Sequence, residues 1–199
     1  MTSDLPLEPD FFRHGVLEVA RALIGVRMTV EGVGGLIVEV EAYERTDPAS
    51  HAFRGPTARN AAMFGPPGHA YVYRSYGIHW CLNLVSGPKP GAAVLIRALE
   101  PTDGIAIMQS RRGMADLLRL CAGPGRVCQA LAITRATHDG LPLDRPPFAL
   151  SRNDHVRAVA SGPRIGLTKG VETPWRFGLK GSPYLSRPFP GPPERLKRG

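Results

Sequence analysis

Apolar side chains recur along residues 10–23 at the spacing of one face of an α-helix. They are Phe11, Phe12, Val16, Val19, Ala20 and Leu23. Two mostly apolar stretches follow, 23–30 and 36–43, and the segment between them, 31–35, is rich in glycine. Apolar stretches on either side of a glycine-rich turn are typical of a β-hairpin. We therefore expect the helix to pack on a sheet that begins with this hairpin.

The same criteria predict three further strands and two short helices. The strands are expected at 70–76, 79–86 and 92–99, and the helices at 103–112 and 125–133. The chain is expected to return to ordered structure at 164–167 and 175–179. The segment 134–161 is charged and contains prolines, and it receives no role. The basic, proline-rich tail, 188–199, is expected to be frayed.

No internal repeat and no dividing linker interrupts these elements. The 199 residues, 43% of them hydrophobic, suffice for one sizeable core. The sequence thus predicts an α+β fold, a single compact domain over 1–199 that is ordered over about 10–187, with a mainly antiparallel β-sheet and short flanking helices.

Composition narrows the setting in which the chain works. No apolar stretch reaches the roughly 18 to 20 residues of a membrane helix, and the acidic, proline-containing start is unlike a signal peptide. We expect a soluble intracellular protein with no membrane partner. Three cysteines without a CxxC pair or a histidine cluster predict reduced thiols and no bound metal.

The formal net charge is +8, and 21 of the 25 basic residues are arginine. Arginine is well suited to bidentate contact with phosphate, so an anionic partner such as nucleic acid is indicated. Codon bias, or a basic protein that binds nothing in particular, would give the same composition. Charge alone indicates non-specific affinity and no particular activity.

The stretch 36–43 alternates between apolar and polar residues. Leu36, Val38, Val40 and Ala42 share one face, expected to meet the core, and Glu39, Glu41 and Tyr43 share the other. A carboxylate two residues before an aromatic on one face could hold a water while the ring stacks on a base. Taken alone, the pattern more often marks a solvated strand face.

The stretch 71–77 holds three tyrosines and an arginine. Aromatics beside arginine suit base stacking and phosphate contact, although Tyr71 and Tyr73 could equally form a core pair. Tyr76, beside Gly77 at a strand end, is a plausible wedge for the gap left by a flipped nucleotide. The polar segment 44–67 is too long for a simple turn and is a functional-loop candidate. It carries His51, which by itself is more often a surface histidine without a role.

Read together, separated blocks of the sequence resemble the alkyladenine (3-methyladenine) DNA glycosylase family in order and spacing. The resemblance extends from about residue 11 to about residue 186 and rests on Glu41-Ala42-Tyr43, His51, Thr57-Ala58-Arg59-Asn60, residues 71–77, Cys81-Leu82-Asn83, Arg97-Ala98-Leu99-Glu100-Pro101 and residues 123–131. It implies a curved sheet like that of the formyltransferase C-terminal domain. It also implies a DNA repair glycosylase that flips an alkylated or deaminated purine out of duplex DNA and hydrolyses its N-glycosidic bond, which leaves an abasic site for base excision repair.

The resemblance assigns roles only to matching positions. Glu41 becomes the general base that activates water, and Arg97 supports it. Tyr43 and His51 would lie on opposite faces of the flipped base, with Tyr73 at its edge. Asn83 would clash with the exocyclic amino group of normal guanine.

By the same resemblance, Tyr76 enters the duplex, and Arg59 and Arg126 contact the phosphate backbone. No lysine occupies a matching catalytic position, so a monofunctional enzyme with a water nucleophile and no lyase step is implied. The expected partner is double-stranded DNA with damaged purines, the expected state is a monomer, and no cofactor and no metal are expected. The protein would be cytoplasmic and associated with the nucleoid in a bacterium, and nuclear in a eukaryote.

The sequence departs from the family at Arg74-Ser75, at Ile78-His79 and at Gly178, where a bulkier residue is expected. These departures leave pocket depth and the lesion range open among 3-methyladenine, 7-methylguanine, hypoxanthine and ethenoadenine. One alternative is a non-catalytic nucleic-acid-binding domain of the same fold. Another is a glycosidase of free nucleosides or sugars, which needs an acidic pair and for which Glu39 is the obvious partner of Glu41.

Overall fold

The computed structural model describes residues 5–152 and 157–190. The strands are β1 (Leu5–Pro6), β2 (Arg27–Val30), β3 (Val33–Tyr43), β4 (Ala70–Ser75), β5 (His79–Val85), β6 (Ala93–Asp103), β7 (Phe148–Arg152), β8 (Val159–Gly162) and β9 (Arg176–Leu179). The helices are the 3-10 helices η1 (Pro9–Arg13) and η2 (Ala61–Phe64), and the α-helices α1 (Val16–Ala22), α2 (Ile105–Arg112), α3 (Leu117–Leu120), α4 (Pro124–Ala130) and α5 (Arg135–His138).

The strands form one open sheet in the order β1-β7-β2-β3-β6-β5-β4, and β8 and β9 join it through β3. Their pairings are all antiparallel in the part of the chain that the structure describes. One edge of β3 pairs with β6, while β2 and β9 pair with successive parts of β3. The predicted α+β class with an antiparallel sheet is therefore confirmed.

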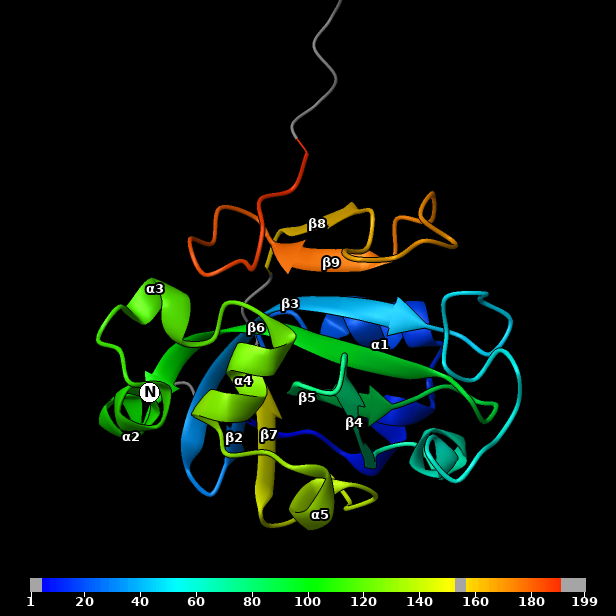
Figure 1. The fold of residues 1–199 in the computed structure, drawn as a ribbon, viewed down its shortest axis with the longest axis horizontal. Helices are drawn as coiled ribbons and strands as arrows, with labels where there is room; N and C mark the ends of the chain where they lie inside the picture. Colours follow the sequence, from blue (N-terminus) through cyan, green and yellow to red (C-terminus); the bar gives the residue numbers. More distant parts are fainter. Residues whose placement is uncertain (1–4, 153–156, 191–199) are drawn as a thin grey trace, which may run out of the picture.

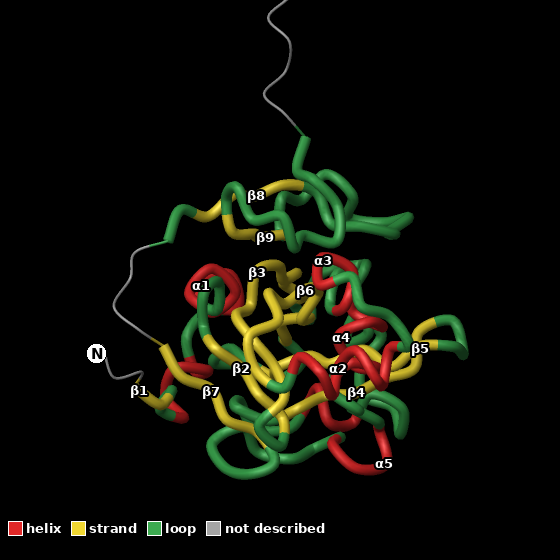
Figure 2. The backbone as a smooth tube through the Cα atoms, turned by 90° about the vertical axis from the view of Figure 1, so that its left-hand side faces the viewer, coloured by secondary structure: helices red, strands yellow, loops and turns green. Residues whose placement is uncertain are grey.

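Helices cover both faces of the sheet. Figure 1 shows α1 behind β3 and α4 in front of β5 and β6, and Figure 2, turned by 90°, places α1 on one side of the sheet and α2, α3 and α4 on the other. The main core contains Val16 and Val19 of α1, Val127 of α4, and Val40 and Ala42 of β3. The β8–β9 pair lies beyond the end of this layer, next to β3.

The predicted first hairpin is confirmed as β2–β3, but its turn is shorter than expected. Only Glu31 and Gly32 form the turn, both at positive φ (50° and 76°). Gly34 and Gly35 belong to β3, where a Cβ would overlap the backbone of β2 or β6. These glycines therefore permit close strand pairing and do not form the turn.

The single helix expected over 10–23 is wrong. The chain forms η1 and α1, with His14 and Gly15 between them at extended ψ angles of 165° and 139°. Glycine weakens a helix interior and allows the break. The apolar stripe still meets the core through Phe12, Val16 and Leu23, so the periodicity located the buried face correctly.

Residues 134–161, which received no role, contribute to the sheet through β7 and β8. β7 lies between β1 and β2, so it joins the edge strand β1 to the rest of the sheet. Of the tail expected to be frayed, residues 191–199 lie outside the described residues. Within 188–190, Phe189 packs so closely over Gly178 that a Cβ there would overlap its ring. None of the helices in residues 5–152 and 157–190 is long and apolar enough to cross a membrane.

Candidate active site

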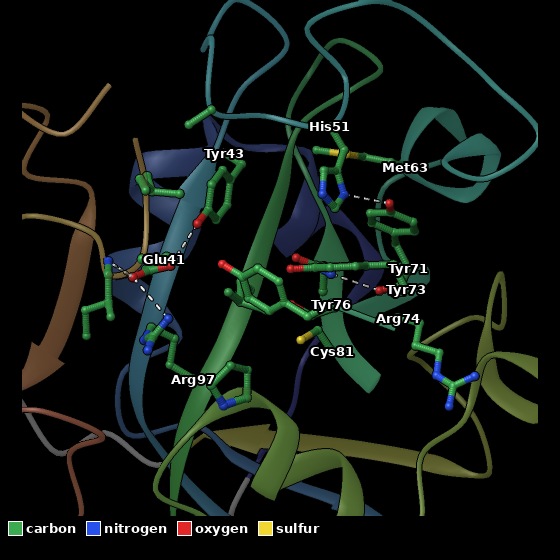
Figure 3. Close-up of a pocket in the computed structure, with 18 of the residues that line it drawn as sticks. Glu41, Tyr43, His51, Met63, Tyr71, Tyr73, Arg74, Tyr76, Cys81 and Arg97 are labelled. Carbon is green, nitrogen blue, oxygen red and sulfur yellow. Dashed lines mark hydrogen bonds and ion pairs between the residues drawn. The ribbon is translucent and has the colours of Figure 1, made fainter. Parts of the chain in front are cut away.

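A cavity of about 450 Å³ opens between β3, the β4–β5 hairpin, the 44–67 loop and residues 165–167 (Figure 3). It is lined by most of the side chains that the sequence singled out: Glu41, Tyr43, His51, Arg59, Tyr73, Tyr76, Asn83 and Arg97. Arg126 is not among them. It lies in α4, whose first residue, Pro124, does line the cavity. The fold thus brings together residues from 41 to 167 at one place.

Glu41 is fully buried at the wall of this cavity. Its Oε1 accepts a hydrogen bond from the backbone N–H of Ile165 (2.7 Å) and lies 3.2 Å from Nη1 of Arg97. Its Oε2 accepts one from the hydroxyl of Tyr43 (2.8 Å). A carboxylate oxygen has room for about two donors, so Oε2 can accept one more, for example from a water in the cavity. The solvated strand face that the alternation alone favoured is wrong.

Arg97, on β6, joins Glu41 to Glu39. Its Nε donates to Oε1 of Glu39 (3.1 Å), and its Nη2 donates to Oγ of Ser186 (3.3 Å). Burial disfavours the charged guanidinium, but the charges of Glu41 and Glu39 outweigh it and raise the pKa of Arg97. One positive charge thereby faces two buried carboxylates, and these contacts fix the orientation of Arg97.

Glu39 does not line the cavity. Besides Arg97, it accepts hydrogen bonds from Nε of Arg176 (2.7 Å) and from the hydroxyl and N–H of Ser186. Among the described residues that line the cavity, Glu41 is therefore the only carboxylate. The acidic pair that a two-carboxylate glycosidase needs does not face this cavity.

Tyr43 and His51 lie on opposite sides of the cavity in Figure 3. Burial, followed by the charge of Glu41, raises the pKa of Tyr43, so its hydroxyl stays protonated and donates to Glu41. Burial, followed by the charge of Arg59, lowers the pKa of His51. Its ring is therefore neutral at neutral pH.

Two tyrosines of β4 support His51. Nδ1 of His51 is hydrogen-bonded to the hydroxyl of Tyr71 (2.9 Å), and its ring meets that of Tyr73 edge-on at 4.4 Å between centroids. Tyr71 is 2% exposed and stacks on Tyr73 at 5.7 Å. Burial raises the pKa of Tyr71 to about 12. The core pair is confirmed, because the two rings stack in a core cluster, and both rings also line the cavity. Stacking of Tyr71 or Tyr73 on a base stays a prediction.

Asn83, on β5, is 5% exposed and donates from Nδ2 to the backbone oxygen of Tyr71 (3.1 Å). Its partner fixes the amide in the cavity wall. Tyr76, in contrast, is 86% exposed at the tip of the β4–β5 hairpin. Its φ of +50° is unusual for a residue with a side chain, and Gly77 follows at +69°. Arg59 donates from Nη2 to the backbone oxygen of Arg74 (3.0 Å), which ties the 44–67 loop to this hairpin.

The sequence pattern did not single out two contributors to the site. Ile165 contributes a backbone N–H, which carries no side-chain signature, and Arg164 is a buried cation that stacks on Tyr43 (4.7 Å). The only available signal was the return of order expected at 164–167. Residues 5–152 and 157–190 contain no group of three or more His, Cys, Asp or Glu side chains that could hold a metal ion.

Comparison with known proteins adds an independent finding. Residues 10–183 match the family described as methylpurine-DNA glycosylase. The chain is 61% identical over 186 residues to a protein of Bradyrhizobium diazoefficiens, covering 93% of this chain and 92% of that one. It is 60% identical over 185 residues to a protein of Rhodopseudomonas palustris (92% of each chain) and 58% identical over 182 residues to one of Nitrosospira multiformis (91% and 94%). All three carry the name "Putative 3-methyladenine DNA glycosylase".

Proposed function

The chain belongs to the methylpurine-DNA glycosylase family, and from this premise we propose that it excises alkylated or deaminated purines from duplex DNA by hydrolysis, leaving an abasic site. The observation that carries the proposal is the single carboxylate of Glu41. It is held by Arg97, Ile165 and Tyr43 at the wall of an aromatic cavity, with one acceptor position unused.

The cavity suits a purine that has been turned out of the duplex. Tyr43 and His51 would flank the base, and Tyr73 would contact its edge. An alkylated purine is positively charged, and stacking on tyrosine favours such a ring by roughly 0.5 to 2 kcal/mol. A neutral His51 adds no repulsion. Asn83, fixed by its bond to Tyr71, would oppose the exocyclic amino group of undamaged guanine.

Glu41 then acts on the sugar rather than on the base. A water bound to Oε2 would attack C1′ and give its proton to Glu41, while the C1′–N bond breaks and its electron pair leaves with the base. A purine that carries a positive charge from alkylation thereby departs as a neutral molecule, whereas hypoxanthine departs as an anion and takes up a proton from water. The negative carboxylate also stabilises the positive charge that develops on the sugar. Because water is the nucleophile, no covalent intermediate and no lyase step follow.

The outer residues would hold the DNA. Tyr76, exposed at the hairpin tip, would fill the gap in the base stack, and Arg59 and Arg126 would contact phosphates. One site on one chain suffices for this reaction, so a monomer is proposed. Action in base excision repair, in the cytoplasm of a bacterial cell at the nucleoid, follows from the same substrate.

The first test is single-turnover excision from a duplex oligonucleotide that contains one hypoxanthine or one methylated purine. The Glu41→Gln variant keeps the size of the side chain but loses the base and one of the two acceptor oxygens, and it should be slower by about a hundredfold or more. Glu100→Gln is the matched control, because Glu100 lies on β6 and does not line the cavity. It should excise at the rate of the unmodified protein.

Binding of the duplex should be measured in parallel. If the unmodified protein binds damaged duplex but releases none of several damaged purines, the proposal fails and a non-catalytic DNA-binding domain takes its place. If Glu41→Gln retains full activity, the protein is a glycosylase but Glu41 is not its base.

A further inference from the structure

A buried ion pair lies directly behind the proposed catalytic wall. Arg164 is 5% exposed, and its Nη1 donates to the backbone oxygen of Ala42 (3.0 Å) and to Asp47. Its Nη2 donates to Oδ1 of Asp47 (3.1 Å) and to Oγ1 of Thr173 (3.1 Å). One guanidinium thus connects β3, the 44–67 loop and the loop 166–173.

Two aromatic rings also lie close to this guanidinium. Its carbon lies 4.7 Å from the ring centre of Tyr43 and 5.2 Å from that of Trp175. Tyr43 therefore lies against a cation and also lines the cavity. The backbone oxygen of Trp175 in turn accepts a hydrogen bond from Ala42, which lies between Glu41 and Tyr43 on β3. These contacts restrict both position and orientation of the Tyr43 ring.

Arg164 immediately precedes Ile165, whose N–H binds Glu41. The Ile165 N–H belongs to the planar peptide group that begins at the carbonyl of Arg164, so the contacts that anchor the Arg164 side chain restrict where this N–H points. Two of the three groups around Glu41, the Ile165 amide and the Tyr43 hydroxyl, are thus held by one side chain.

We infer that Arg164 is a positioning residue, which holds the Ile165 N–H and the Tyr43 hydroxyl in register with Glu41. This inference rests on the proposed function, in which Glu41 activates the attacking water. A contribution of Arg164 to the stability of the fold is by itself a weak explanation for a buried arginine at this position. A buried ion pair often adds less stability than well-packed apolar residues of similar volume, and Nε of Arg164 is buried without a hydrogen-bond partner in the described part of the chain.

Arg164→Lys separates positioning from charge. Lysine keeps a cation beside Asp47 but has no planar fork with which to reach Ala42, Asp47 and Thr173 together. We expect the single-turnover excision rate at saturating enzyme to fall about tenfold to a hundredfold, as for a misplacement on the scale of 1 Å. The Kd for undamaged duplex should change less than threefold, because the proposed backbone contacts of Arg59 and Arg126 and the exposed ring of Tyr76 are not altered.

Thr173→Ala provides a milder version if the lysine variant does not fold. It removes one of the contacts to Nη2 and should lower the same rate by about two- to fivefold. Arg27→Lys is the matched control. Arg27 also pairs with an aspartate, Asp103, but does not line the cavity, so its excision rate should not change.

The outcomes separate the possibilities. A rate that falls in Arg164→Lys and Thr173→Ala, with unchanged Kd and normal Tm, supports positioning. A rate equal to that of the unmodified protein in both variants overturns it, and so does a rate loss that only follows a matching loss of Tm or of DNA binding. If the unmodified protein itself excises nothing, the proposed function fails and not this inference alone.

Discussion

The guanidinium of Arg97 lies between two buried carboxylates, those of Glu39 and Glu41. Its Nε faces Glu39 and its Nη1 faces Glu41, so one rigid group sets the separation of both. A lysine has a single ammonium head and could not serve two carboxylates in this geometry. Sequence alternation placed Glu39, Glu41 and Tyr43 on one face of β3, but it could not show that the face is covered.

Two histidines, the buried His138 and the exposed His51 at the rim of the cavity, make the stability of the fold depend on pH. Burial lowers the pKa of His51 and of His138 below the ordinary value of 6.5. The unfolded chain then binds protons at a higher pH than the folded chain, so the stabilising contribution is complete above about pH 6.5 and is lost as the pH falls below it. We expect the urea midpoint to decrease between about pH 7.5 and about pH 5.5.

The double variant His51→Gln, His138→Gln serves as the comparison for this experiment. Because glutamine does not titrate, its midpoint should change less over the same range than that of the unmodified protein. An equal decrease in both proteins would assign the pH dependence to other groups.

The tip of the β4–β5 hairpin combines an unfavourable backbone conformation with a residue that is proposed to enter the duplex. Tyr76 adopts a φ of +50° at the tip, where an L side chain is disfavoured by roughly 1 kcal/mol, and its exposed ring makes little contact with the fold. Tyr76→Gly should therefore leave the free energy of unfolding unchanged or raise it by up to about 1 kcal/mol. The same variant should bind damaged duplex about tenfold more weakly, since stacking on a base is lost.

Tyr76→Phe keeps the ring and removes only the hydroxyl, so its DNA affinity should stay close to that of the unmodified protein. Chemical denaturation and a fluorescence-anisotropy titration measure the two quantities. If Tyr76→Gly binds as tightly as Tyr76→Phe, the hairpin tip does not enter the duplex.

Elements defined by local pattern were predictable, and those defined by distant contacts were not. The strands β3 to β6 follow apolar or alternating runs and were located to within a few residues. β7 and β8 lie in a charged, proline-containing stretch, and they are strands because β2 and β9 pair with them. The resemblance led us to expect a bulkier residue at Gly178, but Phe189 occupies the space that a larger side chain would need. Arg164 was not predicted for the same reason, since two of its partners, Ala42 and Asp47, lie more than a hundred residues earlier.

The net charge of +8 belongs to the molecule as a whole and should control its affinity for undamaged DNA. The logarithm of the association constant should fall linearly with the logarithm of salt concentration, because each phosphate contact releases counterions. Arg59→Ala should reduce the magnitude of this slope by about one. Arg145→Ala is the control, because Arg145 is paired with Asp144 and does not line the cavity. An unchanged slope in Arg59→Ala would show that Arg59 does not contact a phosphate.

The antiparallel pairing of β9 with β3 has a consequence for the order in which the protein is made. Glu41 leaves the ribosome early, whereas its amide donor at Ile165 and the strand that covers it, β9, are translated more than a hundred residues later. A chain interrupted before residue 165 contains the carboxylate, Tyr43 and Arg97 but not the peptide group that binds the carboxylate. The arrangement around Glu41, on which the proposed base excision depends, is therefore one of the last features that the growing polypeptide acquires.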